Sequence, residues 1–196
     1  ACEDLFYQMV RRLKDAEELS METVFIDGTK LEACANKYTF VWKKSVGKWE
    51  EKMFHKIQEA VRLLNHDYMQ SFAVNAESRA QDLQKISGYL EEKCQQDETE
   101  FVYGRGRRKS KNQKYLELFQ RFRERQVTYD WHTASFQGRN NYCKTDPDAT
   151  FMHMKDDHMR NAQLKPGYNI QIGVDSEYIV AADIFQDRND VWTLVP

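Results

Sequence analysis

Hydrophobic side chains recur with helical spacing in four stretches of the chain, at about residues 3–18, 48–68, 76–93 and 112–126. In the second and longest stretch the apolar positions lie three or four residues apart, as on one face of a helix. These positions are Trp49, Met53, Ile57, Ala60, Val61, Leu64 and Tyr68. The pattern predicts four amphipathic helices, of which the second and third form a helical hairpin.

The end of the chain has the pattern of β-strands. Apolar residues and polar or glycine residues alternate over residues 169–174, which is typical of a half-buried strand. Turn-forming residues follow at 175–177, and a second, more buried strand is predicted over 178–185. Together these segments predict a β-hairpin. Asn189 or Asp190 is then predicted to cap a further helix.

A short apolar run also lies before the long helical stretches. Val24, Phe25 and Ile26 predict a buried strand over residues 23–27, which ends at Asp27. A carboxylate leaving a buried strand is held rigidly by the sheet, as a metal site requires. An Asp–Gly pair after a strand is also a common turn. The spacing alone therefore leaves both roles open for Asp27.

The predicted elements divide the chain into three parts. Residues 1–47 carry the first helix and strand, residues 48–129 are helical and include a basic loop, and residues 130–196 hold a loop and the hairpin. The predicted fold class is α+β or α/β, a partial mixed sheet with a large helical insertion. The chain begins within an amphipathic pattern and stops at a predicted helix start, which favours a fragment of a longer protein.

Composition excludes several classes of protein. Charged residues make up 31% of the 196 residues, mean hydropathy is −0.81, and no apolar run approaches the roughly 20 residues of a membrane span. The chain is therefore predicted to be soluble and cytoplasmic. Its cysteines, Cys2, Cys34, Cys94 and Cys143, are widely spaced without a CxxC pair, which argues against a zinc site or a disulfide framework.

Positive charge is concentrated in one segment. Between Arg105 and Arg125 there are nine Lys or Arg against two Glu, whereas the whole chain has a net charge of −2. Such asymmetry predicts contact with a polyanion through this segment, although a solvated surface loop would look the same. The residues predicted to contact a phosphate backbone are Arg105, Arg107, Arg108, Lys109 and Lys111, with Lys43 and Lys44 nearer to Asp27 in sequence.

Three strings of the sequence carry a more specific signal. They are VFIDGTKLEACANKYTFVWKK from residue 24, GRNNYCKTDPDATFMHMKDDHMRNAQLKPGYNIQIGVDSEYIV from residue 138, and DIFQDRNDVWTLVP from residue 183. Together they resemble bacterial insertion-sequence transposases of the DDE class, whose catalytic domain has an RNase H-like fold. The resemblance extends over nearly the whole chain, from about Leu5 to Pro196.

The resemblance implies roles for several segments. Asp27 would be the first metal-binding aspartate, residues 168–185 would supply the second and third strands, and residues 48–126 would be an insertion. The full-length enzyme would use Mg²⁺ or Mn²⁺ to cut DNA at transposon ends and join it to a target. It would act in the bacterial cytoplasm, at the nucleoid, as a homodimer or larger oligomer on DNA.

Part of the family pattern is missing from the chain. The second aspartate and the glutamate of the catalytic triad are expected after Pro196, so this chain alone is predicted to be inactive. Asp175, in the predicted turn, and Asp183, on the last strand, are weaker candidates for a second acid. Two alternatives stay open: an inactive remnant that binds DNA or itself through the helical insertion, and a structural helical module in which Asp27 is a turn residue.

Overall fold

The computed structural model describes residues 2–104, 108–155 and 162–193, which fold as two compact units. The sheet unit consists of residues 1–42 and 138–196, and the helical unit consists of residues 43–137. The helical unit begins before and ends after the predicted boundaries of 48 and 129. Its first helix already starts at Lys43, and its last helix continues to Phe136.

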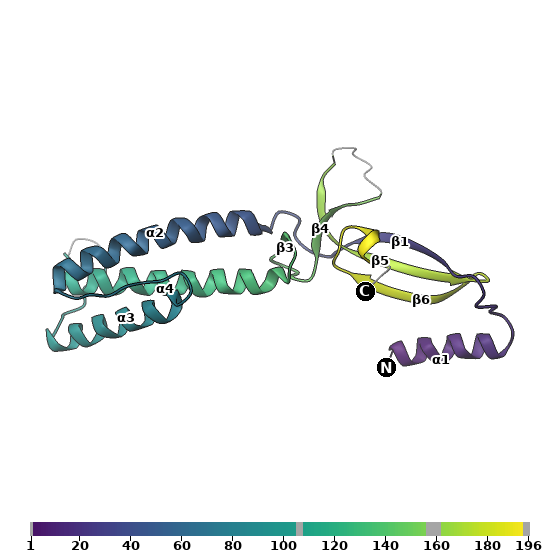
Figure 1. Ribbon diagram of the computed structural model, residues 1–196, viewed down its shortest axis with the longest axis horizontal. Helices are drawn as coiled ribbons and strands as arrows, with labels where there is room; N and C mark the ends of the chain where they lie inside the picture. The colour runs from purple at the N-terminus through teal and green to yellow at the C-terminus, as the bar shows by residue number, and fades with distance from the viewer. Residues whose placement is uncertain (1, 105–107, 156–161, 194–196) are drawn as a thin grey trace. The chain divides into compact units, whose positions relative to one another are not determined.

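Three long helices make up the helical unit (Figure 1). They are α2 (Lys43–Tyr68), α3 (Arg79–Gln96) and α4 (Lys111–Phe136), and α4 packs against both of the others. Their apolar stripes meet in a common core, as amphipathic helices require. The buried residues of this core include Met53, Ile57, Val61, Leu64, Leu83, Ile86, Leu90, Leu116, Phe119 and Phe122.

Helix α4 is longer than its sequence pattern predicts. The prediction ended it near Gln126, shortly after the stripe of Tyr115, Leu118, Phe119 and Phe122. In the structure the buried face continues through Gln126 itself, then Tyr129 and Phe136. A buried glutamine and a tyrosine extend the face that packs, so a pattern based on aliphatic residues stops too early.

The sheet unit contains one larger antiparallel sheet (Figure 1). Its strands are β1 (Phe25–Glu32), β4 (Thr150–His153), β5 (Leu164–Asp175) and β6 (Tyr178–Phe185). Strand β5 is central, because its residues pair on both edges: Gly167 pairs with Glu32 of β1 and with Thr150 of β4. Further along, β5 pairs with β1 on one edge and with β6 on the other.

The remaining elements of this unit are short or lie apart. Helix α1 (Cys2–Asp15) has no buried residue. Strands β2 (Phe40–Trp42) and β3 (Asn141–Cys143) pair in a small second sheet, and a 3₁₀ turn covers Asp190–Trp192. The Asn189 side chain caps this turn by accepting a hydrogen bond from the Val191 N–H, which confirms the predicted cap. The chain is thus a mixed α and β protein with antiparallel sheets.

The predicted C-terminal hairpin is confirmed. Strands β5 and β6 are joined at Ser176 and Glu177, whose φ angles of 50° and 72° suit a tight hairpin turn. The prediction that the second strand is the more buried one is wrong, since β6 is largely exposed and β5 alternates between buried and half-buried positions. The reason is position: β5 is flanked on both edges, and β6 on one.

The prediction of a buried first strand ending at Asp27 is also wrong. Strand β1 begins at Phe25 and continues to Glu32, so Asp27 is its third residue. Phe25 is 73% exposed and Ile26 is 55% exposed. Among the described residues β1 pairs with β5 alone and is an edge strand. Its apolar run therefore reflects strand propensity without the burial that such a run usually implies.

A small core forms where the irregular loop after α4 returns to the sheet. Cys143, Ala149 and Phe151 are buried together, with Ala33, Ala35, Leu164 and Tyr168 packed against them. The loop is pinned by Arg139, which donates hydrogen bonds to the carbonyl oxygens of Pro147 and Asp148. This core fixes the end of β1 against the start of β5.

Gly167 is expected to be essential for this junction. A Cβ atom at this position would lie 2.6 Å from the backbone oxygen of Leu31. This clash is costly because a backbone atom cannot move aside as the end of a flexible side chain can. Gly167→Ala is therefore expected to lower the free energy of unfolding of the sheet unit by about 1–3 kcal/mol. Chemical denaturation measures this change. In the control, Gly88→Ala on α3, the new Cβ has open space and is expected to stabilise the protein by up to about 1 kcal/mol.

Candidate functional site

Asp27 stands open to solvent on a strand whose backbone is fixed. It pairs in register with Ile172 of β5, and its side chain is 92% exposed. Because side chains alternate between the two faces of a strand, Asp27 shares its face with Phe25 and Leu31. Both are largely exposed, so no described element covers this face of β1. The backbone of Asp27 is thus fixed by pairing with β5, while its carboxylate is accessible to solvent.

Lys155 is the one described cation that reaches Asp27. Its Nζ lies 3.7 Å from Asp27 Oδ1 and donates a hydrogen bond to the backbone oxygen of Gly28. Both side chains are more than half exposed, so the ion pair is screened by water and adds little stability. No motif or periodicity in the sequence marks Lys155, which lies 128 positions from Asp27.

The opposite face of β1 is occupied by a polar cluster. Gly28 lies against Gln171, and a Cβ at Gly28 would collide with the amide of that side chain. Asn169 Nδ2 donates to Asp190 Oδ1 at 2.8 Å, and Gln171 Nε2 donates to the same oxygen at 3.3 Å. Asn169 and Gln171 are both buried. This cluster ties the 3₁₀ turn to the sheet and gives Asp190 a structural role.

The other acids of the sheet unit are engaged in hydrogen bonds. Asp175 is buried and accepts hydrogen bonds from Met21 N at 2.6 Å, Ser176 Oγ at 3.0 Å and Ser20 Oγ at 3.3 Å. The bond from Met21 N is the main reason that its pKa lies below the usual range. Asp175 therefore anchors the segment before β1 to the hairpin turn.

Asp146 and Tyr168 form a second engaged pair. The Tyr168 hydroxyl donates to both carboxylate oxygens of Asp146, at 2.9 and 2.8 Å. Burial, together with this bond, raises the pKa of Tyr168 to about 12. Asp183 differs, since it is exposed and its Oδ1 accepts a hydrogen bond from the N–H of Ile184, the next residue. Within the described ranges, neither Asp146 nor Asp183 belongs to a group of three possible metal ligands.

The donor set for a divalent cation is incomplete in the part of the chain that the structure describes. Within it, no three His, Cys, Asp or Glu side chains gather closely enough to hold a metal ion. Mg²⁺ is usually bound by one or two carboxylates together with waters and substrate phosphates. Asp27 supplies one carboxylate, and Lys155 competes for it. These residues alone do not make the two-metal site of a phosphoryl-transfer enzyme.

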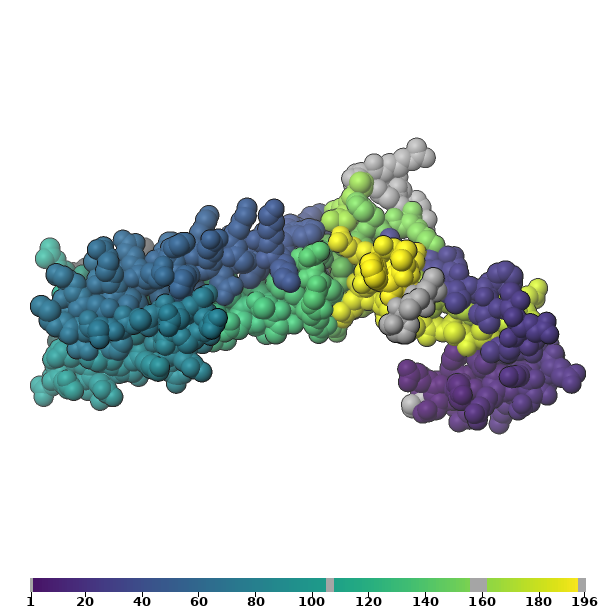
Figure 2. Space-filling view, in the orientation of Figure 1, coloured from purple at the N-terminus to yellow at the C-terminus, as the bar shows by residue number. Residues whose placement is uncertain are grey.

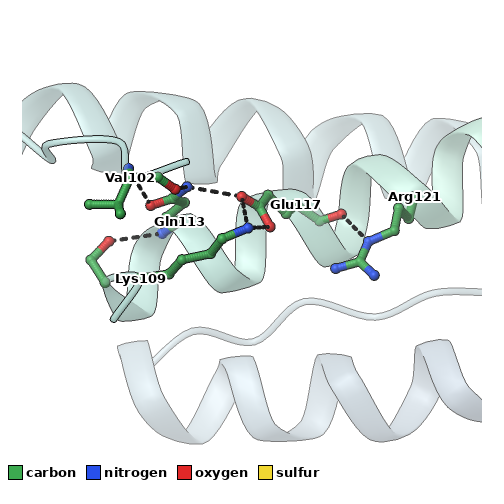
Figure 3. Close-up of polar contacts among 6 residues, drawn as sticks. Val102, Lys109, Gln113, Glu117 and Arg121 are labelled. Carbon is green, nitrogen blue, oxygen red and sulfur yellow. Dashed lines mark hydrogen bonds and ion pairs between the residues drawn. The ribbon is translucent and has the colours of Figure 1, made fainter. Parts of the chain in front are cut away.

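Part of the positive charge at the start of α4 is neutralised by a carboxylate of the same helix, that of Glu117. Lys109 Nζ lies 2.7 Å from both carboxylate oxygens of Glu117 (Figure 3). Gln113 is buried and binds Val102 through both its amide oxygen and its amide nitrogen, and it also donates to Glu117 at 2.9 Å. The pKa of Glu117 is lowered, chiefly by Lys109. Lys109 therefore holds the incoming loop on α4.

Lys111 is likewise engaged within the helical unit. Its Nζ lies 2.7 Å from Asp67 Oδ2 near the end of α2, and the Tyr115 hydroxyl donates to the same oxygen at 2.8 Å. The hydrogen bond from Lys111, followed by that from Tyr115, lowers the pKa of Asp67 to about 2. Lys111 and Tyr115 thus connect the start of α4 to the end of α2.

The remaining predicted phosphate contacts are distributed differently. Arg108 is exposed at the edge of the described segment, and Arg105 and Arg107 lie outside the described residues. Lys43 and Lys44 are exposed at the first turn of α2. They belong to the helical unit, whereas Asp27 belongs to the sheet unit. Of the predicted set, Arg108, Lys43 and Lys44 are the described cations that are free for an external anion.

Comparison with known proteins adds no assignment. No protein-family model, curated protein or solved structure matches the chain. Within the described ranges, no helix combines the length and the apolar character needed to cross a membrane. Function is therefore inferred from the site and from the sequence strings alone.

The ion pair of Asp67 predicts a pH dependence. Because its pKa falls from 3.8 to about 2 on folding, Asp67 stabilises the folded state above pH 4. That contribution is lost as the pH falls from about 4 to 2. The difference in unfolding free energy between wild type and Asp67→Asn, measured by chemical denaturation, is expected to shrink over this range. Glu59→Gln, at an exposed position of α2, is the control, and an equal pH dependence of both differences would contradict the assignment.

Proposed function

We propose that the chain is part of a DDE-class DNA transposase and carries its first metal-binding aspartate, Asp27. The observation that carries the proposal is the position of Asp27 on β1. Its backbone is fixed by pairing with β5, while its carboxylate is 92% exposed. A ligand that is rigid and still accessible is what a site acting on bulky DNA requires.

The strand arrangement supports the same proposal. The sequence resemblance expects the strand of Asp27 to be followed, after a helical insertion, by a hairpin that supplies the next two strands. In the sheet unit β5 pairs antiparallel with β1 on one edge and with β6 on the other. The helical unit, residues 43–137, lies between β1 and β5 in sequence. This agrees with the antiparallel half of an RNase H-like sheet carrying an insertion.

In this proposal Asp27 acts together with acids outside the present chain. The resemblance places the second aspartate and the glutamate after Pro196, and the full set would bind Mg²⁺ or Mn²⁺. Bound metal would stabilise charge on the attacking and leaving oxygens of the phosphodiester. The part played by this chain is to hold one carboxylate in a fixed position, with Lys155 Nζ 3.7 Å from it.

The proposal is tested by DNA cleavage with the protein encoded by the complete reading frame. That protein is expected to nick duplex DNA carrying the element's ends in the presence of Mg²⁺, and to be inactive with a chelator. Cleavage that persists in the chelator would contradict a metal-dependent mechanism. Absence of cleavage under all metal conditions would overturn the proposal of an active enzyme.

A second candidate function is favoured by the incomplete donor set. Because no three possible metal ligands gather among the described residues, the chain also fits an inactive remnant that binds DNA or itself through the helical unit. The length of the reading frame distinguishes the two. A frame that ends at Pro196 favours the remnant, and one that continues with an aspartate on a strand and a glutamate on a helix favours the enzyme.

A further inference from the structure

The outer face of α2 carries a regular row of lysines. Lys44, Lys48, Lys52 and Lys56 recur every four residues, and all of them are exposed. Four residues of helix rise by about 6 Å, so the row extends over about 18 Å. Arg62 lies five helical turns after Lys44 and so has the same angular position on the helix as Lys44.

The direction of this row is fixed by packing. The opposite side of α2 is buried in the helical core through Val46, Met53, Ile57, Ala60, Val61 and Leu64. Ile57 and Leu64 are fully buried, so the helix cannot rotate without opening the core. Figure 2 shows the outer side of α2, in blue, open along its length. The lysines therefore face solvent as a group.

The positive charge of the row exceeds the negative charge on the same face of α2. Among the described residues, no acid lies within ion-pairing distance of Lys44, Lys48, Lys52 or Lys56. Glu51 and Glu59 lie on the same helix face, and they leave an excess of positive charge. Lys109 and Lys111 differ, because each has a carboxylate 2.7 Å away. Unpaired lysines in a row are the more available contact for an anion.

A polyanion with closely spaced charges would complement this row. One strand of duplex DNA presents a phosphate about every 3.4 Å along its axis, so about 18 Å of helix faces roughly five phosphates. An anionic membrane fits less well, since a helix lying on a membrane inserts its apolar face, and that face of α2 is buried in the core. A helix with a basic outer face and a buried apolar face can contact the phosphate backbone of DNA, which requires no apolar insertion.

We infer that the lysine row of α2 docks on the phosphate backbone of duplex DNA, independently of base sequence. The choice of DNA among polyanions rests on the proposed function. The row adds Lys48, Lys52 and Lys56 to the sequence-predicted contacts and places the main contact on α2. Contacts of this kind position a protein on DNA and carry no sequence information.

The test compares DNA affinity of the 196-residue chain and two variants. The probe is a short fluorescent duplex of random sequence, and anisotropy is followed from about 50 to 200 mM salt. Lys48→Gln/Lys52→Gln removes two charges from the row. Lys85→Gln/Lys93→Gln removes two charges from α3 of the same unit and is the matched control. Thermal unfolding checks that all three chains are folded.

The row variant is expected to lose affinity, and its slope of log K against log salt is expected to fall in magnitude by about 1.8, since each phosphate contact contributes about 0.9. The control is expected to keep the wild-type slope. Equal slopes for the row variant and wild type would overturn the inference and leave the proposed function to its own cleavage test. Failure of wild type to bind DNA at low salt, or tighter binding to anionic vesicles than to DNA, would also overturn it.

Discussion

Asp27→Asn is expected to abolish metal-dependent DNA cleavage by the protein encoded by the complete reading frame. Metal ions contribute several kcal/mol of charge stabilisation to phosphoryl transfer, so loss of one ligand is expected to slow cleavage on the order of 10³-fold. Asparagine keeps the size of the side chain and removes its charge. The measurement is the single-turnover rate of strand cleavage at saturating Mg²⁺.

The same substitution is expected to leave the fold intact. The Asp27 side chain is 92% exposed, and its ion pair with Lys155 is solvated, so the free energy of unfolding should change by less than about 0.5 kcal/mol. DNA affinity should also be retained. Asp183→Asn, on the exposed edge of β6, is the control and is expected to cleave DNA normally. Loss of cleavage in Asp183→Asn together with full activity in Asp27→Asn would contradict the assignment.

Phe119→Ala is expected to have the largest effect on stability. Phe119 is fully buried on α4, the helix that packs against both α2 and α3, and its ring contacts that of Phe122 edge to face at 5.9 Å. Truncation of a buried phenylalanine costs about 3–5 kcal/mol. Domains are stable by about 5–15 kcal/mol, so the helical unit should become marginal.

The change is measured by thermal unfolding of the 196-residue chain. For a unit of this size the melting temperature is expected to fall by roughly 15–30 °C, since 1 kcal/mol corresponds to about 4–8 °C. Val127→Ala, on the same helix but 68% exposed, should change it by only a few degrees. Similar melting temperatures for Phe119→Ala and wild type would show that α4 does not hold the core together.

Elements with strong periodicity could be predicted from the sequence. The stripes of α2 and α3 and the alternation in β5 follow from local spacing, and so does the cap at Asn189. Spacing alone does not establish the short strands: the aromatics Tyr38, Phe40 and Trp42 alternate with Thr39, Val41 and Lys43, which fits a short strand or an ordered loop. Residues 40–42 form a strand because they pair with residues 141–143, and no local pattern shows a partner so distant in the chain. The same holds for β4, which pairs with the start of β5.

The candidate site was predictable only in part. The resemblance identified Asp27, but its exposure depends on which elements cover β1, and a run of three apolar residues does not determine that. Lys155 approaches Asp27 from a distant segment. The sequence predicted Lys109 and Lys111 to be available for phosphate. Their carboxylate partners, Glu117 and Asp67, are brought close only by the folding of a loop and by helix packing. The sequence shows where the cationic side chains are, and the tertiary structure determines which of them are free to contact an anion.

Direct observation of metal at Asp27 tests the central claim most sharply. Mn²⁺ bound to the protein encoded by the complete reading frame can be counted by electron paramagnetic resonance, for wild type and for Asp27→Asn. If Asp27 is a metal ligand, the variant should bind Mn²⁺ at least about 10–100-fold more weakly, with no change in folding. Equal Mn²⁺ affinity in the two proteins would contradict the claim that Asp27 holds the catalytic metal.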